Sequence, residues 1–419
     1  MNSNNKILLA ILWPFGALVS ALRNWREPWA MNVFWVVCAF LGAIHIFHPV
    51  GTVLGDGADA GRYMLDLQYM YQSVHSYSEI SRNFYDGDTN DVFATTLLFL
   101  VSRITDSGHV FFFVLAIIYG FFYSRNIWYI LDKIRDERIN RLWILIALFF
   151  FVGPIWFING VRMFTAMHVF CYGALPYLLD GDKKKLVWPI LSFFIHFSFT
   201  FVIVIFAAYI LIIKKYSRNN IVLTVLLGFY LVTLTIKSLD LSAASSLLHV
   251  YLPGFFDARI DGYVNEDTLN KRLDSLSYNS WHVAFFNDIQ YWCNQVLVLI
   301  SFITVKKYKD QLYNILPLFA FALLIYGFAN IFACVPSGGR YIVIAKMFMI
   351  PVFIFIFKYA VGDYSLSRYM KPIIVFLAFS LIFEIRKGLE NYGVGLMGNF
   401  FTAYLFDDRT PIIYLIKFL

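Results

Sequence analysis

Apolar runs of helical length recur along most of the chain, and they limit the folds that it can adopt. A helix needs about 20 predominantly apolar residues to cross the hydrocarbon core of a bilayer. Runs close to this length are Met31–Phe47, His109–Leu131, Leu142–Ile158, Met163–Leu179, Ile221–Lys237, Ile289–Val305, Leu312–Val335, Tyr341–Val361 and Lys371–Ile385. The pattern predicts an all-α protein, a polytopic bundle with about nine transmembrane helices.

The amino-acid composition indicates that lipid, rather than a single protein core, shields the apolar surface. Charged residues make up 15% of the chain, against about 25% in ordinary globular domains, and the mean hydropathy is +0.65. No polar linker divides the sequence, so residues 1–419 are predicted to form one integral membrane domain. Ile7–Leu22 is apolar but lacks a convincing cleavage site, so we expect no cleavable signal peptide and an interfacial segment instead.

Basic residues occur in short clusters between the apolar runs, and these clusters predict the orientation of the bundle. The clusters are Arg23/Arg26, Lys133/Arg135/Arg138/Arg141, Lys183–Lys185, Lys214/Lys215/Arg218, Lys306/Lys307/Lys309 and Lys358/Arg368/Lys371. Short loops rich in lysine and arginine stay in the cytoplasm. The net charge of +7 is therefore a sign of topology, and no nucleic-acid partner is expected.

The segments between the remaining span ends are then expected on the outer side of the membrane. They are residues 49–108, 159–162, 238–288, 336–340 and the stretch from Arg386. Segments 49–108 and 238–288 are predicted to be long outer loops. Within them Asp91–Ile104 and Ser242–Leu252 are apolar but short, so we expect interfacial or re-entrant helices there.

Residues 186–213 form an apolar run with lysines at both ends, which a single crossing would not allow if both ends are cytoplasmic. Two helical arms of about 14 residues would each rise about 21 Å, less than the roughly 30 Å of hydrocarbon. We therefore expect a short helical hairpin with its turn near His196–Ser198. The alternative is one long tilted helix.

The segment Gly55–Tyr63 places charged side chains directly after the first predicted span. Asp56, Asp59 and Arg62 are spaced by three residues, so a helix would bring them to one face. The neighbouring glycines would let a ligand approach the backbone. Charged groups near membrane depth are costly and mark functional sites. The alternative is a polar loop in which Asp59 caps a helix.

Two further arginines follow glycines in short outer turns. Arg162 ends the turn Asn159–Arg162, where it could bind lipid head groups or present a planar guanidinium to a phosphate. Arg340 follows Gly338-Gly339, and the amides of that turn would add to an anion site. Together with Arg62, these arginines predict a polyanionic ligand at the membrane surface, for which a lipid pyrophosphate is the simplest candidate.

His196 lies at the predicted tip of the hairpin. A lone histidine in an aromatic run is more often a hydrogen-bonded core residue, but broken helices in membranes usually line cavities. A neutral imidazole there could orient or deprotonate a sugar hydroxyl. Lys346, Glu384 and Arg386, in or near apolar runs, rank lower as functional candidates, and His45 is expected to be interfacial.

The order of these elements resembles that of the EpsG-type, Wzy-like polysaccharide polymerases of bacterial membranes. The shared elements are Asn24-Trp25-Arg26 before the first span, Gly55 to Tyr63, Gly160-Val161-Arg162 with Ala166, a basic loop followed by Ile195-His196-Phe197-Ser198, and Gly339-Arg340-Tyr341. Each motif is short, so their order and spacing from about Asn24 to Tyr341 carry the resemblance. Family members often have a polar residue after the first of these glycine-linked arginines, where this chain has Met163.

The resemblance implies a glycosyltransferase related to the GT-C type, which needs no cofactor. Such an enzyme would polymerise undecaprenyl-pyrophosphate-linked oligosaccharide repeat units into a surface polysaccharide, such as an O-antigen of lipopolysaccharide or an exopolysaccharide. It would act on the outer face of the bacterial cytoplasmic (inner) membrane. A flippase and chain-length regulator proteins are the protein partners that this function implies.

The resemblance also suggests roles for the polar residues. His196 or Asp59 would be the base that takes the acceptor proton. Arg162 and Arg340 would bind the pyrophosphate, and Arg62, whose match to the family pattern is weaker, would assist them.

Asp56 and Tyr63 are candidate contacts to the acceptor sugar. No metal site is expected, because the sequence has no ligand cluster with metal spacing. An O-antigen-ligase-like transferase would share the donor and differ in the acceptor. A transporter or flippase of lipid-linked sugars would show internal repeats and charges on both sides of the midplane. A membrane acyltransferase would also use a lone histidine, but the outer arginines suit it less well.

Overall fold

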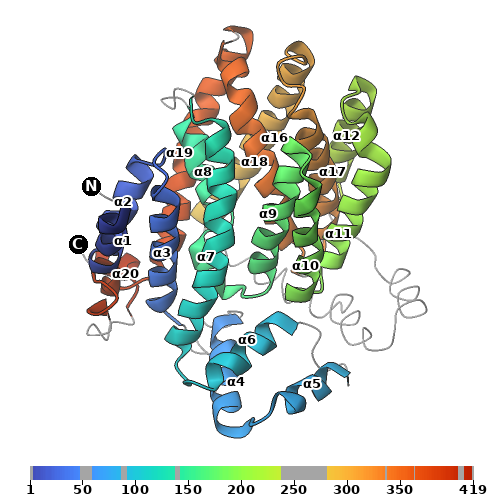
Figure 1. The fold of residues 1–419 in the computed structure, drawn as a ribbon. Helices are drawn as coiled ribbons and strands as arrows, with labels where there is room; N and C mark the ends of the chain where they lie inside the picture. The colour runs from blue at the N-terminus through green and yellow to red at the C-terminus, as the bar shows by residue number, and fades with distance from the viewer. Residues whose placement is uncertain are drawn as a thin grey trace.

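The computed structural model describes residues 3–47, 59–85, 92–136, 142–236, 281–335, 337–362, 364–403 and 410–417. All the regular secondary structure in these ranges is helical, which confirms the predicted all-α class. Most of the helices stand side by side as a bundle (Figure 1). Three helices of the segment predicted as the first outer loop lie together below the bundle in this view: α4 (Asp59–Ser73), α5 (Tyr77–Tyr85) and α6 (Val92–Ser102).

Each predicted apolar run overlaps helical structure. The remaining elements are α1 (Ser3–Leu12), α2 (Pro14–Arg23), α3 (Ala30–Ala43), α7 (Gly108–Lys133), α8 (Trp143–Phe150), η2 (Ile155–Asn159), α9 (Met163–Asp180), η3 (Lys183–Leu186), α10 (Val187–Ile195), α11 (Phe199–Ala208), η4 (Tyr209–Ile213), η5 (Lys214–Tyr216), α12 (Asn220–Thr233), α16 (Trp281–Lys307), α17 (Leu316–Phe332), α18 (Arg340–Gly362), α19 (Tyr364–Leu389), η7 (Val394–Met397) and α20 (Ile412–Lys417). The expected helix at Ser242–Leu252 lies outside the described residues.

Several of these helices are apolar enough for a membrane. Among the described residues, Gly108–Lys133, Phe199–Tyr216 and Arg340–Phe357 are long and apolar enough to cross a bilayer by length and composition. Shorter apolar helices accompany them, among them α3, α12 and α17. The chain is therefore built as an all-helical membrane protein.

Helices α3 and α7 pack closely because small residues lie where they touch. A Cβ atom added to Gly42 would lie 2.3 Å from the Cβ of Ala116, and one added to Gly120 would lie 2.6 Å from the Cβ of Cys38. Small residues let two backbones approach where lipid supplies no hydrophobic driving force. His109 at the start of α7 hydrogen-bonds the carbonyl of Ala43 at the end of α3 (2.9 Å), so the two helices run antiparallel.

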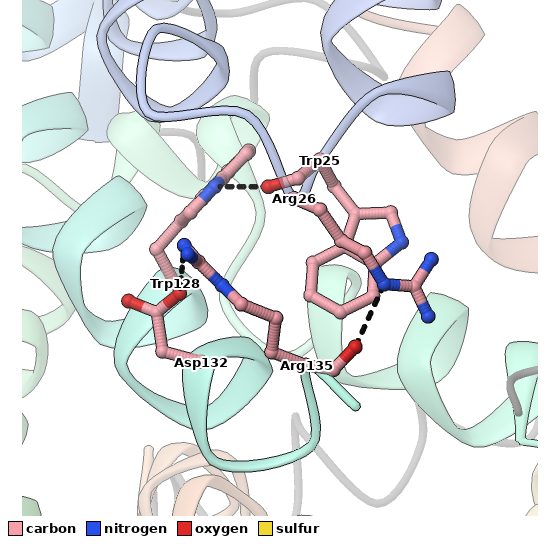
Figure 2. Close-up of polar contacts among 5 residues, drawn as sticks. All are labelled: Trp25, Arg26, Trp128, Asp132 and Arg135. Carbon is pink, nitrogen blue, oxygen red and sulfur yellow. Dashed lines mark hydrogen bonds and ion pairs between the residues drawn. The ribbon is translucent and has the colours of Figure 1, made fainter. Parts of the chain in front are cut away.

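The connection between α2 and α3 is fastened to the end of α7, as Figure 2 shows. Trp128 donates from its indole nitrogen to the carbonyl of Trp25 (3.0 Å), and Arg26 donates from Nε to the carbonyl of Arg135 (2.7 Å). The guanidinium of Arg26 also lies 4.4 Å from the ring centroid of Trp25. Asp132 and Arg135 form an ion pair of 2.8 Å. We call this end of the bundle the basic end, and the opposite end, where α4 lies, the α4 end.

The apolar run over residues 186–213 is divided between α10 and α11, with the break at His196–Ser198, the position that the sequence indicates. Lys185, just before α10, lies over the ring of Tyr172 (4.0 Å), and Lys214, after η4, lies over the ring of Tyr177 (3.4 Å). Both tyrosines belong to the second half of α9. The two ends of the run therefore return to the basic end, and the turn between them points to the α4 end.

The predicted span Leu142–Ile158 is not one helix. Gly153 takes a left-handed conformation (φ 69°) before Pro154, and the chain continues as the short 3-10 helix η2. The carbonyl of Gly153 accepts hydrogen bonds from the hydroxyl of Tyr119 (2.8 Å) and from Nε2 of His168 (2.8 Å). A break in a membrane helix is tolerated where neighbouring side chains satisfy the freed backbone groups. The prediction of one span over Leu142–Ile158, which rested on hydropathy, missed this break.

Candidate functional site

A cavity of about 290 Å³ lies at the α4 end, where four parts of the chain meet. Its lining comes from the start of α4, from η2 and the turn into α9, from the start of α18, and from the end of α19. The residues are Asp59, Trp156, Phe157, Asn159, Gly160, Phe164, Arg340, Lys387, Glu390 and Asn391. Both signs of charge, amides and aromatic rings thus surround one space, and we call it the polar cavity.

Asp59 is the charge that links two of these segments. It is the first residue of α4, where a carboxylate is favoured by the helix dipole. Its carboxylate accepts a hydrogen bond from Arg62 and forms an ion pair of 3.7 Å with Nη2 of Arg340. The side chain of Asp59 is only 12% exposed, whereas that of Arg340 is 39% exposed. The ion pair with Asp59 therefore holds the Arg340 guanidinium in place, while part of the side chain stays exposed, as contact with a ligand requires.

Arg340 begins α18 after a tight turn in which Gly338 lies too close to the backbone of Phe332 for a side chain. Ser337 has a φ of 62°, and a Cβ on Gly338 would lie 1.6 Å from the carbonyl oxygen of Phe332. The amide of Gly338 donates to Val335 O (3.0 Å), and the amide of Arg340 donates to Ser337 O (3.3 Å). These two amides hold the turn together, so neither of them contributes to the predicted anion site.

The hairpin tip reaches the same end of the bundle. Ser198 directs its hydroxyl to the sulfur of Met163, 3.7 Å away at the start of α9, and its carbonyl accepts from the hydroxyl of Tyr341 (3.1 Å) at the start of α18. His196, two residues before Ser198, is half-buried. The tip therefore lies beside the two chain segments that carry Arg162 and Arg340.

Arg162 lies between the hairpin and α4. It immediately precedes α9 and is half-buried. Burial raises the pKa of Asp66 on α4, and the nearby guanidiniums of Arg62 and Arg162 partly offset this. Arg162 thus faces the charged side of α4, while Gly160, two residues earlier, lines the polar cavity. The structure brings Asp59, Arg62 and Arg340 into contact and leaves Arg162 at their margin.

Tyr63 and Asp56 were the candidate contacts to an acceptor. Tyr63 is 8% exposed, and its ring stacks on that of Phe111 in α7 with the centroids 6.3 Å apart. This packing docks α4 on the bundle. Asp56 lies outside the described residues.

The end of α19 is the part of the polar cavity that sequence reasoning missed. Lys387, Glu390 and Asn391 line it, although the predicted span ended at Ile385 and only Glu384 and Arg386 were noted. The mixed charges from Glu384 to Glu390, at the end of an apolar run, are the sequence feature that could have indicated this part of the site. Gly388, between them, lets α19 approach the indole of Trp156, since a Cβ there would lie 3.0 Å from the ring.

A partly buried chain of polar side chains fixes this end of α19. Nε2 of His45 and Oδ1 of Asn159 are 2.6 Å apart, and Asn159 donates from Nδ2 to Oδ1 of Asn391 (3.3 Å). The amide of Ile46 donates to the carbonyl of Asn391 (3.0 Å). His45, just after the end of α3, is fully buried among protein side chains. Its role is to join the ends of α3, η2 and α19 beneath the polar cavity.

The residues around the cavity offer charge pairing, hydrogen bonding and aromatic packing, which suit a ligand that is both anionic and rich in hydroxyl groups. Within the described ranges, no group of three or more His, Cys, Asp or Glu side chains gathers as metal ligands.

The fold and this cavity define a polytopic helical membrane protein with a polar site at one end of its bundle. The model of the EpsG family matches residues 36–404, and the chain belongs to this family. Membership makes it a membrane protein of polysaccharide synthesis and confirms the resemblance seen in the sequence. No curated protein and no solved structure matches the chain.

Proposed function

We propose that this protein is a glycosyltransferase that polymerises undecaprenyl-pyrophosphate-linked repeat units, with the polar cavity as its active site. The observation that carries the proposal is the Asp59–Arg340 ion pair inside a cavity that also holds amides and aromatic rings. A sugar linked to a pyrophosphate needs both kinds of contact. Aromatic rings and amides hold the sugar, and a guanidinium holds the phosphate.

The orientation of the bundle supports an active site on the outer face. The loops rich in lysine and arginine lie at the basic end, and short loops of this kind stay in the cytoplasm. The α4 end, with the polar cavity, would then face the periplasm or the cell exterior. There it meets lipid-linked glycans after their transfer across the membrane. We further propose about nine spans and a GT-C-like arrangement for the whole bundle.

The reaction forms one glycosidic bond and breaks one phosphoester bond. A hydroxyl oxygen of the acceptor sugar attacks the anomeric carbon of the donor glycan, and the bond from that carbon to the pyrophosphate oxygen breaks. The bonding electrons leave with undecaprenyl pyrophosphate, and the hydroxyl proton passes to a base. The donor is already activated, so the protein mainly has to orient both substrates and stabilise developing negative charge.

The contacts of Asp59 are the basis on which we assign a role to each charged residue. Its carboxylate already pairs with Arg62 and Arg340, so we assign it to holding Arg340 toward the pyrophosphate. We assign His196 as the base that takes the hydroxyl proton, because it lies in the half-buried turn beside the start of α18. Arg162 would guide the anionic group into the cavity from its margin.

A reconstituted reaction tests this function. Purified protein in lipid nanodiscs is incubated with undecaprenyl-pyrophosphate-linked repeat units, and the products are separated on a gel. A polymerase yields a ladder of lengthened glycans, whereas a flippase leaves the glycan length unchanged. A ligase-like transferase would extend a different acceptor and give no ladder. Absence of a ladder from folded protein with an authentic repeat unit would refute the proposal.

A further inference from the structure

Two other hollow spaces meet the polar cavity, one on each side of α8. The first is a groove of about 500 Å³ between α2, α3, α7 and α8, which we call the α3 groove. The second is a cavity of about 240 Å³ between α8, α16, α18 and α19, which we call the lysine cavity. Trp156 lines both the α3 groove and the polar cavity, and Phe157 lines both the lysine cavity and the polar cavity.

Opposite faces of α8 line the two spaces. Trp143, Ile146, Ala147 and Phe150 face the α3 groove, and their spacing is that of one helical stripe. Leu145, Leu148 and, just beyond the helix, Val152 line the lysine cavity. The short helix α8 therefore separates the two spaces. The 3-10 helix η2 continues this separation up to the polar cavity, because Trp156 lines the α3 groove and the next residue, Phe157, lines the lysine cavity.

The two spaces differ in charge. In the lysine cavity, Lys346 donates from Nζ to Oε1 of Gln290 (2.9 Å), and Lys387 donates to Oε1 of Glu384 (3.1 Å). The two lysines and one carboxylate leave a positive balance above an apolar floor that includes Leu148 and Leu377. An ionisable group at membrane depth is costly and marks a functional site. Such a cavity suits an anionic head group attached to an apolar chain.

The α3 groove is almost entirely apolar and opens to the surrounding lipid. Its wall includes Trp143, which is 51% exposed. Its cations, Arg23 and Arg26, belong to the connection at the basic end, away from the junction with the polar cavity. The α3 groove therefore suits the hydrocarbon chain of a lipid whose pyrophosphate is not the leaving group of the reaction in the polar cavity.

We infer that α8 separates two prenyl chains. The donor's chain lies in the lysine cavity, with its pyrophosphate where this cavity meets the polar cavity, between Arg340 on one side and Lys346 and Lys387 on the other. The acceptor's chain lies in the α3 groove. This assignment rests on the proposed function, because a polymerase must hold two lipid-linked substrates at once. The donor's pyrophosphate is the leaving group and needs cations beside the reacting bond. The acceptor reacts through a sugar hydroxyl, so its pyrophosphate needs none there.

Photolabelling tests the inference without requiring polymerisation. Wild-type protein in nanodiscs is illuminated with a long-chain prenyl pyrophosphate that carries a diazirine near its head group, and labelled residues are identified by mass spectrometry. Label on both faces of α8, at Ala147 or Ile146 and at Leu148 or Leu145, is the expected result. In K346M we expect label in the lysine cavity to fall about tenfold, a loss equal to one missing charge contact, and label in the α3 groove to persist.

Space-filling variants give a second readout. Ala147→Trp should remove label from the α3 groove alone, and Leu148→Trp should remove it from the lysine cavity alone, each by about tenfold or more. The matched control is Leu299→Trp on α16, a 40% exposed position that lines neither space. Equal melting temperatures of the variants exclude a general loss of fold.

The outcomes separate the inference from the proposed function. If wild-type protein makes the ladder but the prenyl probe labels one face of α8 or neither, the two-chain inference is overturned and the polymerase remains. If a phospholipid probe labels the α3 groove and the prenyl probe does not, the inference is likewise overturned. If both faces are labelled but no ladder forms with authentic substrate, the polymerase proposal fails while the two prenyl-binding spaces stand.

Discussion

Among the residues that the structure describes, two Asp–Arg pairs with the same i,i+3 spacing lie at opposite ends of the bundle, Asp59–Arg62 at the start of α4 and Asp132–Arg135 at the end of α7 and just beyond it. Asp132 and Arg135, at the basic end, have side chains that are 53% and 45% exposed. Figure 2 shows beside them Trp25 and Arg26 of the α2–α3 connection and Trp128 of α7, whose hydrogen bonds fasten this connection. Asp59, in the pair with Arg62, is largely buried and also pairs with Arg340, far away in the sequence. The same sequence spacing is thus found in an exposed surface pair and in a candidate site. The difference is the long-range ion pair with Arg340, which only the Asp59–Arg62 pair has.

The largest expected effect comes from removing that partner. Arg340→Ala should reduce polymer formation at least about 100-fold, since it removes the cation that stabilises charge at the leaving group. Ladders made by equal amounts of folded protein measure this. Arg135→Ala is the matched control from the other pair and should leave the ladder unchanged. Full activity of Arg340→Ala would show that the two pairs do not differ in function.

The turn before Arg340 offers a sharper test of how that partner is placed. Gly338→Ala should destabilise the protein by about 1–3 kcal/mol or more and impair activity, because its Cβ would collide with the backbone of Phe332. Gly339→Ala is the control, because a Cβ there would meet nothing within 4 Å. Thermal unfolding in detergent and the ladder assay measure both variants. Equal behaviour of the two would contradict this account of the turn.

The hydrogen bonds beneath the polar cavity should have a moderate effect. Asn159→Ala removes the link between His45 and Asn391 and should cost about 1–2 kcal/mol of stability, with a fall in activity. The control is Asn219→Ala, which removes the N-cap contact to Ile221 N (2.8 Å). It should cost about 1 kcal/mol and leave activity intact. A similar loss of activity in both would assign Asn159 a purely structural role.

The smallest effect is expected at the basic end. Asp132→Asn should change stability by less than about 0.5 kcal/mol, because exposed ion pairs contribute little. A melting temperature within error of wild type would support this. A large destabilisation would mean that the pair holds the α2–α3 connection more firmly than its exposure suggests.

Much of the fold could be predicted because each apolar run is close to the length of a membrane helix. The break at His196–Ser198 was also accessible, since lysines at both ends of the run constrain its path. The break at Gly153-Pro154 had a local signal in that dipeptide, but the apolar residues around it concealed it. Tyr119 and His168 hydrogen-bond the carbonyl of Gly153 at this break. Their positions depend on helix packing, which the local sequence does not reveal.

The candidate site was predictable in part for the same reason. Asp59, Arg62 and Arg340 stand out as charges next to apolar runs, so they could be named. The spacing also placed Asp59 and Arg62 on one helix face, but the pairing of Asp59 with Arg340 could not be predicted. Asn159 and Asn391 are ordinary polar residues near helix ends, and they become a pair only when η2 and α19 meet. Lys387 follows a span whose charged end resembled a simple boundary.

The joining of α3, η2 and α19 near residue 391 bears on how the protein is made. A membrane protein emerges from the ribosome from its N-terminus, and early helices assemble first. Asp59 and Asn159 are then in place before Asn391 is synthesised, and the carbonyl of Asn391 completes the contact with Ile46. The nascent chain therefore carries an open, unfinished chamber until α19 is inserted. Under the proposed function, catalysis would then begin only once α19 has been inserted.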